Sequence, residues 1–590
     1  MTIERPRTVM KGIAASPGIV VAPAVVIDRR RTQIPQRHLE ESEVEGEIAR
    51  LRAAIDASRA EIEAARDSVP LTPDHLLVLE AHLMMHRDEL LVDGAITTIR
   101  SKGINAEWAL RGAVDEIKGR LSASRDSYFR ERADDVEHVG DHILRVLVGE
   151  TVAFPVFDQP TVLVLPDLSP ADAARLVQSR VVALVTDLGS ATSHSAILAR
   201  ALEIPAVVGV SDVTRRIGSG DIVVVDGLRG EVLLNVDDAE RARAEDRSRR
   251  YGVFTARLRA RRGKTAKTRD GVRIALHANV ELPAEAALAV AAGAAGIGLY
   301  RTEFLLLDRA EPPDEEEQTR VYSDIVRVMA PRPVVVRTFD VGGDKLPVHD
   351  RVSRGPNPAL GLRGLRLSLA RPDLFRAQLR AVLRSAVHGQ VKLLLPMVST
   401  VAELRAVRVE LDRARAELDA RGVPAGRVTV GVMIEVPSAA IMSDVLAREC
   451  DFFSVGTNDL VQYTLALDRS NPDVAYLASP LDPSILRLLD ITARSAEQRG
   501  IELSMCGDMA AHPLALPLVL GLGYKSLSMP VSSLPVVREI VSRIDLSEAR
   551  RAVRAALLCE GVREVEKLVV EHCGAELRDV WAEQGLDFEA

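Results

Sequence analysis

Short apolar segments alternate with helical patterns over residues 271–590, and this alternation limits the fold more than any other feature of the sequence. The segments with strand character are VRIALHANV, GIGLYRTEF, PVVVRTFDV, VKLLLPMVS, VTVGVMIEV, DFFSVGTND, IELSMCGDM and KSLSMP. A stretch with helical spacing of apolar residues follows each of them. About eight such units in a row are typical of a (β/α)₈ barrel, and a doubly wound sheet rarely needs so many. We therefore predict a TIM barrel for residues 271–590.

Chemically reactive side chains follow most of these strands at the end where such barrels carry their chemistry. They are Arg301, Glu303, Arg337, Asp340, Glu435, Asn458, Asp459 and Cys506, with Arg469 a little further on. Charges that face one mouth must be neutralised. Arginine forks grip phosphate and carboxylate groups, and a pair such as Glu435 and Asp459 suits Mg²⁺, which prefers oxygen ligands. The pattern predicts a doubly ionised ligand that binds together with Mg²⁺.

A second candidate site lies in TDLGSATSHSAILARALEIPAVVG, residues 186–209. The pattern is that of a strand, a small-residue loop and a helix. Thr192 or Ser193 can cap that helix, which places His194 in or beside its first turn, where unpaired backbone N–H groups favour an anion. A lone histidine at a helix start is more often a capping or packing residue. The alternative is an imidazole that carries a phosphoryl group.

The remaining sequence falls into segments that differ in the spacing of their apolar residues. Residues 1–30 and 150–236 have strand and turn patterns, and we expect them to form one mixed α/β domain. Residues 31–149 have long amphipathic patterns, so an α-helical bundle is expected as an insertion in that domain. Residues 237–270 are read as a linker helix and hinge. The basic run RARRGKTAKTRDG could instead bind nucleic acid, but it lacks interleaved aromatic residues.

Composition narrows the class of protein. A chain of 590 residues is too long to fold around a single hydrophobic core, so several domains are expected. Its net charge of −8 argues against a nucleic-acid partner. The four cysteines have no C-x-x-C spacing, which argues against disulfides and structural zinc. The sequence shows no stretch of about 20 apolar residues and no apolar leader pattern. We expect a cytoplasmic protein without a membrane segment.

The motifs TSHSAILAR, GIGLYRTEF, RTFDVGGDK, NPALGLRG, IEVPSA, GTNDL and CGDMA occur in this order. Together they resemble the Enzyme I family of the bacterial sugar phosphotransferase system, and the similarity covers nearly the whole chain. The resemblance implies phosphoryl transfer from phosphoenolpyruvate to His194 and then to a histidine of the carrier protein HPr, with release of pyruvate. This would be the first step of the sugar phosphotransferase system.

The resemblance also assigns roles to single residues. It implies phosphate binding by Arg301 and Arg337, Mg²⁺ ligation by Glu435 and Asp459, further substrate contacts by Asp459, Asn458, Arg469 and Lys345, proton donation by Cys506, and HPr binding near Met84 and Arg132. From the residues alone, an apolar docking patch is suggested by His82, Leu83, Met84 and Met85, with the acidic Asp88 and Glu89 nearby.

Three further expectations concern assembly and rate. The resemblance implies a homodimer through the barrel, and we expect an exposed apolar face near residues 514–522 to take part. Because His194 and the barrel mouth lie in different domains, we expect the histidine domain to swivel. Ser190 and Asp508 stand where the family more often has other residues, and both leave the rate open.

Two rival functions remain at this stage. A pyruvate phosphate dikinase or phosphoenolpyruvate synthase shares both motif groups, but it needs an ATP-binding domain before the histidine, and no P-loop pattern occurs there. A non-catalytic signalling scaffold would tolerate loss of His194 or of the acidic pair, yet Glu435 and Asp459 are both present.

Overall fold

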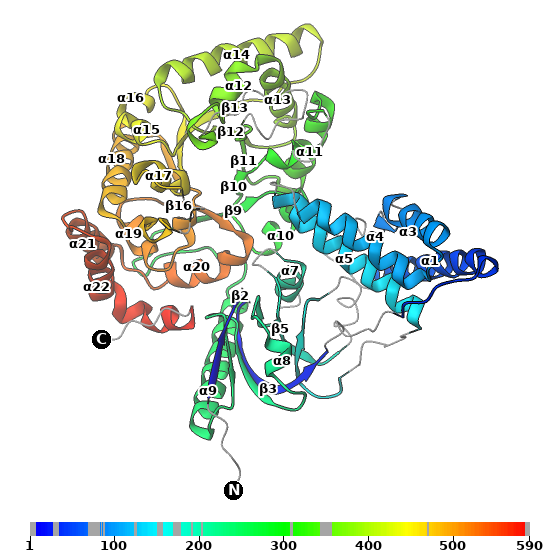
Figure 1. Cartoon of the computed structure of the whole chain (residues 1–590). Helices are drawn as coiled ribbons and strands as arrows, with labels where there is room; N and C mark the ends of the chain where they lie inside the picture. The colour runs from blue at the N-terminus through cyan, green and yellow to red at the C-terminus, as the bar shows by residue number, and fades with distance from the viewer. Residues whose placement is uncertain are drawn as a thin grey trace. The chain divides into compact units, whose positions relative to one another are not determined.

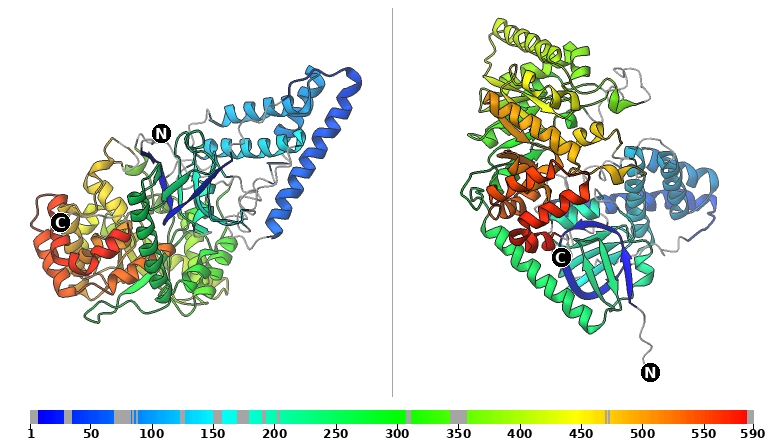
Figure 2. Two further views of the ribbon diagram at one scale, coloured as in Figure 1. Left: turned by 90° about the horizontal axis from the view of Figure 1, so that it is seen from below. Right: turned by 90° about the vertical axis from the view of Figure 1, so that its left-hand side faces the viewer.

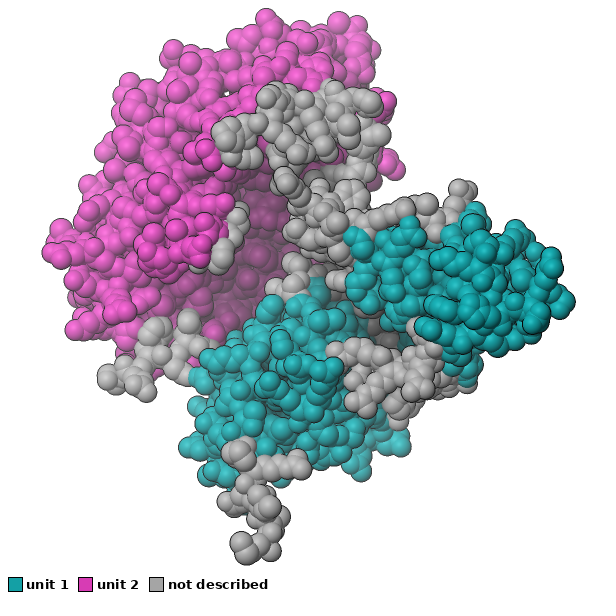
Figure 3. Space-filling view, viewed as in Figure 1, with its two compact units in different colours: residues 1–253 teal, residues 254–590 magenta. Residues whose placement is uncertain are grey.

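The computed structural model describes residues 7–27, 35–68, 83, 85–86, 89–122, 127–149, 157–168, 179–189, 193–201, 204–306, 311–342, 357–468, 471 and 473–584. The chain divides into two compact units, residues 1–253 and residues 254–590 (Figure 3). Among the helices of the described ranges, none is long and apolar enough to cross a membrane. The cytoplasmic location stays a prediction.

A closed barrel of eight parallel strands forms the centre of the second unit. The strands are β9 (Ala275–Val280), β10 (Ile297–Tyr300), β11 (Val334–Arg337), β12 (Val391–Leu395), β13 (Val428–Ile434), β14 (Phe452–Val455), β15 (Glu502–Met505) and β16 (Ser526–Pro530). They follow one another around the barrel in chain order, and β16 pairs with β9 to close it. Each of the eight predicted segments supplies one strand, so the predicted barrel is confirmed.

Helices surround these strands (Figure 1). They are α10 (Glu285–Ala291), α11 (Glu315–Met329), α12 (Leu365–Ala370), α13 (Pro372–Ser385), α14 (Val401–Ala420), α15 (Pro437–Ile441), α16 (Ser443–Leu446), α17 (Thr457–Thr464), α18 (Pro483–Arg499), α19 (Ala515–Gly521), α20 (Leu534–Val541), α21 (Leu546–Ala556) and α22 (Val562–Glu583).

The ends of these helices follow from local sequence, as α18 illustrates. Asp482 accepts a hydrogen bond from the Ser484 backbone N–H at 2.8 Å, which satisfies one of the unpaired donors of the first turn. Pro483 occupies the first helical position, where no N–H is needed. Gly500 ends the helix with φ +69°, a left-handed conformation that glycine adopts without strain.

An eight-stranded sheet forms the α/β part of the first unit. Its strands are β1 (Thr8–Lys11), β2 (Ile13–Ser16), β3 (Ile19–Val26), β4 (Thr161–Leu165), β5 (Val181–Thr186), β6 (Ala206–Val208), β7 (Ile222–Asp226) and β8 (Glu231–Leu234), in the spatial order β1-β8-β7-β3-β4-β5-β6-β2. Strands β3 to β6 are parallel and the outer pairs are antiparallel. The three N-terminal strands therefore complete this sheet, as expected. Short helices α7 (His194–Ala201) and α8 (Val213–Arg216) accompany it.

A helical bundle lies in the sequence between β3 and β4, which confirms the predicted insertion. Its helices α1 (Val44–Ser68), α3 (Glu89–Lys102), α4 (Ala106–Ser122) and α5 (Ser127–Val148) run alongside one another (Figure 2). Their buried side chains form one apolar core. A further helix, α9 (Asp238–Ala260), continues from the first unit into the second.

Two predicted apolar surfaces are not exposed. Residues 514–520 are buried, because α19 packs against α21 and α22 and fills the space beneath them. The expected exposed face at 514–522 is therefore wrong. In the bundle, Leu83 is also buried and Met85 packs against the bundle core, so neither supplies an exposed docking patch. Hydrophobic residues of both segments are used for folding instead.

Candidate active site

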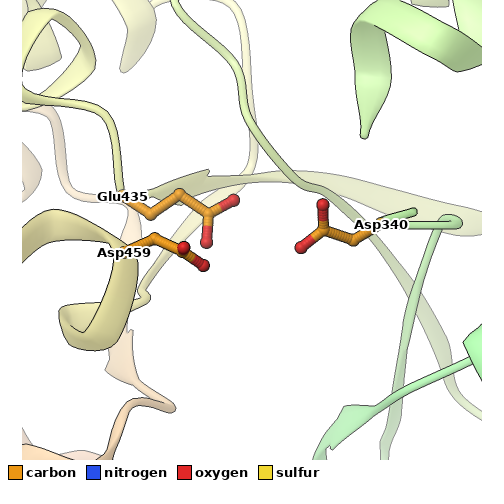
Figure 4. Close-up of side chains that lie close together, drawn as sticks. All are labelled: Asp340, Glu435 and Asp459. Carbon is orange, nitrogen blue, oxygen red and sulfur yellow. The ribbon is translucent and has the colours of Figure 1, made fainter. Parts of the chain in front are cut away.

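Three carboxylates meet at the carboxyl end of the barrel strands (Figure 4). Asp340 lies just after β11, Glu435 follows β13 directly, and Asp459 lies in the first turn of α17, after β14. One oxygen from each of them lies within 4.8 Å of the other two. Because the strands are parallel, their carboxyl ends converge, and the three side chains point toward a common space. Oxygen donors in this arrangement fit a hard divalent cation.

Glu435 is the most deeply buried member of this cluster, with an exposed fraction of 1%. Its Oε1 accepts a hydrogen bond from the Met397 backbone N–H at 2.7 Å. Met397 follows β12 and has φ +58°, so the residue that orients Glu435 adopts a backbone conformation that is uncommon for methionine. Burial, together with the charges of Asp340 and Asp459, raises the pKa of Glu435 well above its usual value. A divalent cation at the cluster would favour the ionised form instead.

Arg363 balances part of this negative charge. Its guanidinium lies 3.0 Å from Asp340 and 3.2 Å from Asp459, and so bridges the two aspartates. Burial alone disfavours its charge, but the hydrogen bond and charge of Asp340 outweigh that and raise the pKa of Arg363 above its ordinary value. Glu435 is left as the carboxylate of the cluster without an arginine hydrogen bond in the described part of the chain. Sequence reasoning gave Arg363 no role, because it does not stand at a strand end.

Two arginines predicted to bind phosphate lie at the same end of the barrel. Arg337 ends β11 and forms ion pairs of 3.1 Å with both Glu303 and Asp340. Its Nε is buried and has no hydrogen-bond partner among the described residues. Arg301 follows β10, is half-exposed and pairs with Glu281. Arginine forks at this end of the barrel suit a phosphate or carboxylate group.

Asn458 and Cys506 belong to the neighbouring strand ends. The Asn458 side-chain amide donates to the Asp508 carboxylate at 2.9 Å and accepts from the Asp508 backbone N–H at 2.9 Å. Asp508 therefore reaches Asn458 although the resembling family more often has glutamate there. Cys506 follows β15, and 3% of it is exposed. Burial raises the pKa of its thiol to about 11, which keeps the thiol protonated at neutral pH.

Gly456 leaves space for Glu435, and the Gly456→Ala substitution tests how tightly the cluster is packed. A Cβ at this position would lie 2.8 Å from Glu435 Oε2. Since Met397 holds the other oxygen, we expect the Glu435 carboxylate to be displaced, the stability to fall by about 1–3 kcal/mol, and the affinity for a divalent cation to fall about tenfold or more. Thermal unfolding and a Mn²⁺ titration measure both effects. Gly252→Ala in α9, where a Cβ meets open space, should leave cation binding unchanged.

The backbone around His194 has the predicted strand–loop–helix form. Strand β5 ends at Thr186 and α7 begins at His194, which places this residue in the first helical turn. Ser195 anchors that turn, because its hydroxyl donates to the Asp167 carboxylate at 2.6 Å and accepts from the Leu168 backbone N–H at 3.2 Å. Gly189 has φ +117°, and a Cβ there would approach Ser193 Oγ to 3.0 Å, so the loop requires glycine.

Several predicted residues lie outside what the structure describes. Met84, Ser190, Lys345 and Arg469 fall in undescribed segments, and for His194 and Arg132 only the helical backbone is described. Among the described residues, the structure brings together Arg301, Arg337, Glu435, Asn458, Asp459 and Cys506 at one end of one barrel. It adds Asp340 and Arg363 to this group. The sequence already identifies Asp340 as a residue that follows a strand, but it assigns no role to this residue.

A barrel whose carboxyl end carries two arginines and a carboxylate cluster has the residue types that enzymes use to bind an anionic substrate, with oxygen donors that fit a divalent cation. Family models agree with this class. The model described as "PEP-utilising enzyme, PEP-binding domain" matches residues 255–546. The models for the N-terminal and mobile domains of PEP-utilising enzymes match residues 11–132 and 157–230.

Relatives of known name narrow the family. The phosphoenolpyruvate-protein phosphotransferase of Listeria monocytogenes is 39% identical over 95% of this chain and 99% of its own length. That of Geobacillus stearothermophilus is 40% identical over 95% and 97%. A solution structure of the Enzyme I protein nEIt is 34% identical, covers 41% of this chain and 99% of its own, and has a TM-score of 0.36. The chain belongs to the phosphoenolpyruvate-protein phosphotransferase family, and it is an enzyme.

Proposed function

We propose that this chain transfers the phosphoryl group of phosphoenolpyruvate to its own His194, and from there to a histidine of the carrier protein HPr. Pyruvate is released, and the reaction is the first step of a sugar phosphotransferase system. The observation that carries the proposal is the meeting of Asp340, Glu435 and Asp459 with Arg301 and Arg337 at one barrel mouth. Membership of the family over 95% of the chain supports it.

The barrel residues would bind and neutralise the substrate. Arg301 and Arg337 grip the phosphate, while Asn458, Asp459, Arg469 and Lys345 make further substrate contacts. Asp340, Glu435 and Asp459 would hold Mg²⁺, the oxygen-preferring cation that phosphoryl-transfer sites commonly use. When bound, that ion supplies positive charge to the substrate phosphate and carboxylate oxygens. Phosphoryl transfer needs positioning and charge neutralisation more than covalent assistance, and these would be the barrel's part in the reaction.

His194 would be the nucleophile. A neutral imidazole has one free ring nitrogen near physiological pH, and it attacks the phosphorus while the bond to the enolate oxygen breaks. The first turn of α7 favours the resulting negative charge. The proposal divides the chain into a histidine domain (1–30 and 150–236), an HPr-binding bundle (31–149) with Met84 and Arg132 at the HPr contact, a linker (237–270) and the barrel (271–590). It requires the histidine domain to swivel between substrate and HPr, and it includes a homodimer through the barrel.

Cys506 would donate the proton that converts enolpyruvate to pyruvate. Its thiol is protonated at neutral pH, and it stands at the strand end next to that of Asp459. The apolar residues packed around it, among them Leu299 and Met433, also allow an inert packing role. The two roles differ in whether the methyl protons of pyruvate exchange with solvent.

Cys506→Ala separates these two roles. If the thiol moves the proton, exchange of pyruvate methyl protons into D₂O should slow by about 10²–10⁴-fold, since the reverse reaction must remove one of them. Proton NMR of the pyruvate methyl signal measures this rate. Cys450→Ala is the matched control, because Cys450 is also buried in the barrel unit but precedes β14. Equal exchange rates in both variants would leave Cys506 with a packing role.

The proposed function is tested directly with ³²P-labelled phosphoenolpyruvate and Mg²⁺. We expect the chain to acquire phosphate that is labile in acid and stable in base, as a phosphohistidine is. Addition of HPr should move the label to HPr and leave the enzyme unlabelled. A chain that stays unlabelled would support the scaffold alternative, and a chain whose label does not pass to HPr would place the partner in another class.

A further inference from the structure

A pocket of about 200 Å³ lies at the amino-terminal ends of β9, β10 and β11. Its lining includes Arg273 shortly before β9, Ala295 shortly before β10 and Arg332 shortly before β11. The candidate active-site residues follow the carboxyl ends of the strands, and none of those described lines this pocket. The pocket is therefore a separate feature at the opposite end of the barrel.

Four cationic side chains line the pocket, namely Lys264, Arg273, Arg332 and Arg538, and no acidic residue is part of its lining. In the described part of the chain, none of the four forms an ion pair with a carboxylate. Lys264 and Arg273 are exposed, whereas Arg332 is half-buried and Arg538 is buried. A concave wall lined by positive charges, without negative ones, attracts an anion.

Arg538, on α20, forms the buried part of this wall, with an exposed fraction of 3%. Its Nη2 donates to the carbonyl oxygens of Ala292 at 3.2 Å and Gly293 at 3.1 Å, which fixes the plane of the guanidinium. Its Nε and Nη1 are buried without a hydrogen-bond partner among the described residues. Because these two atoms have almost no exposed surface, Arg538 acts on the pocket through its positive charge, which the two carbonyl oxygens hold in place.

The adjacent Glu539 differs from Arg538, because its charge is paired within the protein. It is also buried, and it forms ion pairs with Arg261 at 3.0 Å and Arg543 at 2.8 Å. These two arginines are neutralised by the protein itself. The basic run RARRGKTAKTRDG therefore has members of two kinds, since Arg261 forms an ion pair within the protein while Lys264 lines the pocket. Arg273, two residues after the run, also lines the pocket.

We propose that this pocket binds a phosphoryl dianion, either inorganic phosphate or a phosphate monoester with few carbon atoms. Arginine forks match the tetrahedral oxygens of phosphate. The volume is below the roughly 300–1,000 Å³ of pockets for drug-sized ligands, which favours a small ligand. The site does not depend on the proposed function, since it shares no residue with the phosphoenolpyruvate site. Its occupant and a substrate at the carboxyl end do not compete for the same contacts.

The test is calorimetric titration of the full chain with inorganic phosphate at about 0.15 M salt, which screens exposed charges. Arg301→Gln serves as the background because it weakens phosphate binding at the carboxyl end. In that background, Lys264→Ala with Arg273→Ala removes two pocket cations from the surface. Arg262→Ala with Lys267→Ala removes the same charge from the same segment, and neither of those residues lines the pocket. A parallel titration with glycerol 3-phosphate separates the two ligand sources.

We expect the background protein and the Arg262/Lys267 pair to bind phosphate, with a dissociation constant about tenfold higher or more in the Lys264/Arg273 pair. Tighter binding of glycerol 3-phosphate than of phosphate would assign the pocket to a monoester, and equal or weaker binding would assign it to phosphate itself. Equal losses in both pairs would overturn the proposal, as would the absence of binding to the background protein for both ligands. The His194→Ala substitution should leave this titration unchanged whether or not His194 carries phosphate.

Discussion

Replacing His194 with alanine should abolish acid-labile labelling of the chain by phosphoenolpyruvate, with a loss of at least about 10⁴-fold. The substitution removes the nucleophilic nitrogen, and no neighbouring group of the first α7 turn replaces it, because Ser195 is buried and engaged with Asp167. Labelling followed by gel autoradiography at neutral and acidic pH measures the loss. Binding of phosphoenolpyruvate to the barrel should remain, since its contacts lie at the barrel mouth.

His388→Ala is the control for this experiment. His388 is exposed and lies just after α13, where its ring contacts Arg327 at 2.9 Å, away from both candidate sites in the sequence. It should label at the normal rate. Full labelling of the His194→Ala chain would show that another residue accepts the phosphoryl group and would refute the assignment of His194.

Glu435→Gln should reduce the labelling rate on the order of 10³-fold and weaken divalent-cation binding to a similar degree. The amide has the same shape, and its oxygen can still accept the hydrogen bond from the Met397 backbone N–H. The substitution therefore removes the charge of Glu435 while it keeps the packing. A Mn²⁺ titration followed by electron paramagnetic resonance reports cation binding without reference to activity, and thermal unfolding checks that the fold is intact.

Glu449→Gln is the matched control, because Glu449 lies in the same barrel unit and pairs only at the surface with Arg405. It should bind Mn²⁺ and accept label as the unmodified chain does. If Glu435→Gln bound Mn²⁺ normally, the carboxylate cluster would not be the cation site. If it lost Mn²⁺ but kept full labelling, the cation would not serve phosphoryl transfer.

The strand-end rule explains why so much of the site could be predicted. In a parallel barrel every strand points the same way, so a residue that follows one strand is brought near a residue that follows another, however far apart they lie in the chain. Glu435 and Asp459 were identified in this way. Arg363 was not, because it lies in a connection between β11 and β12, and only the folded connection brings its guanidinium to Asp340 and Asp459.

Surfaces were predicted less well than strand ends. The apolar residues of 514–520 suggested an interface, but an apolar stretch looks the same in sequence whether it covers a core or faces solvent. Only the packing of α19 against α21 and α22 shows that it is buried. The arginines near α20 illustrate the same limit. The sequence gives their charge, but only the structure shows which of them have an ion-pair partner.

The sequence by itself determined the barrel, the inserted bundle, the strand–loop–helix around His194 and the residue types at the barrel mouth. These features depend on hydrophobic period, turn residues and caps, which are local along the chain. The tertiary structure decided that Asp340 completes the carboxylate cluster, that Arg363 bridges two of its members, and that backbone carbonyl oxygens hold the buried Arg538 at the other end. Those contacts join residues distant in sequence, and no local pattern encodes the distance between them.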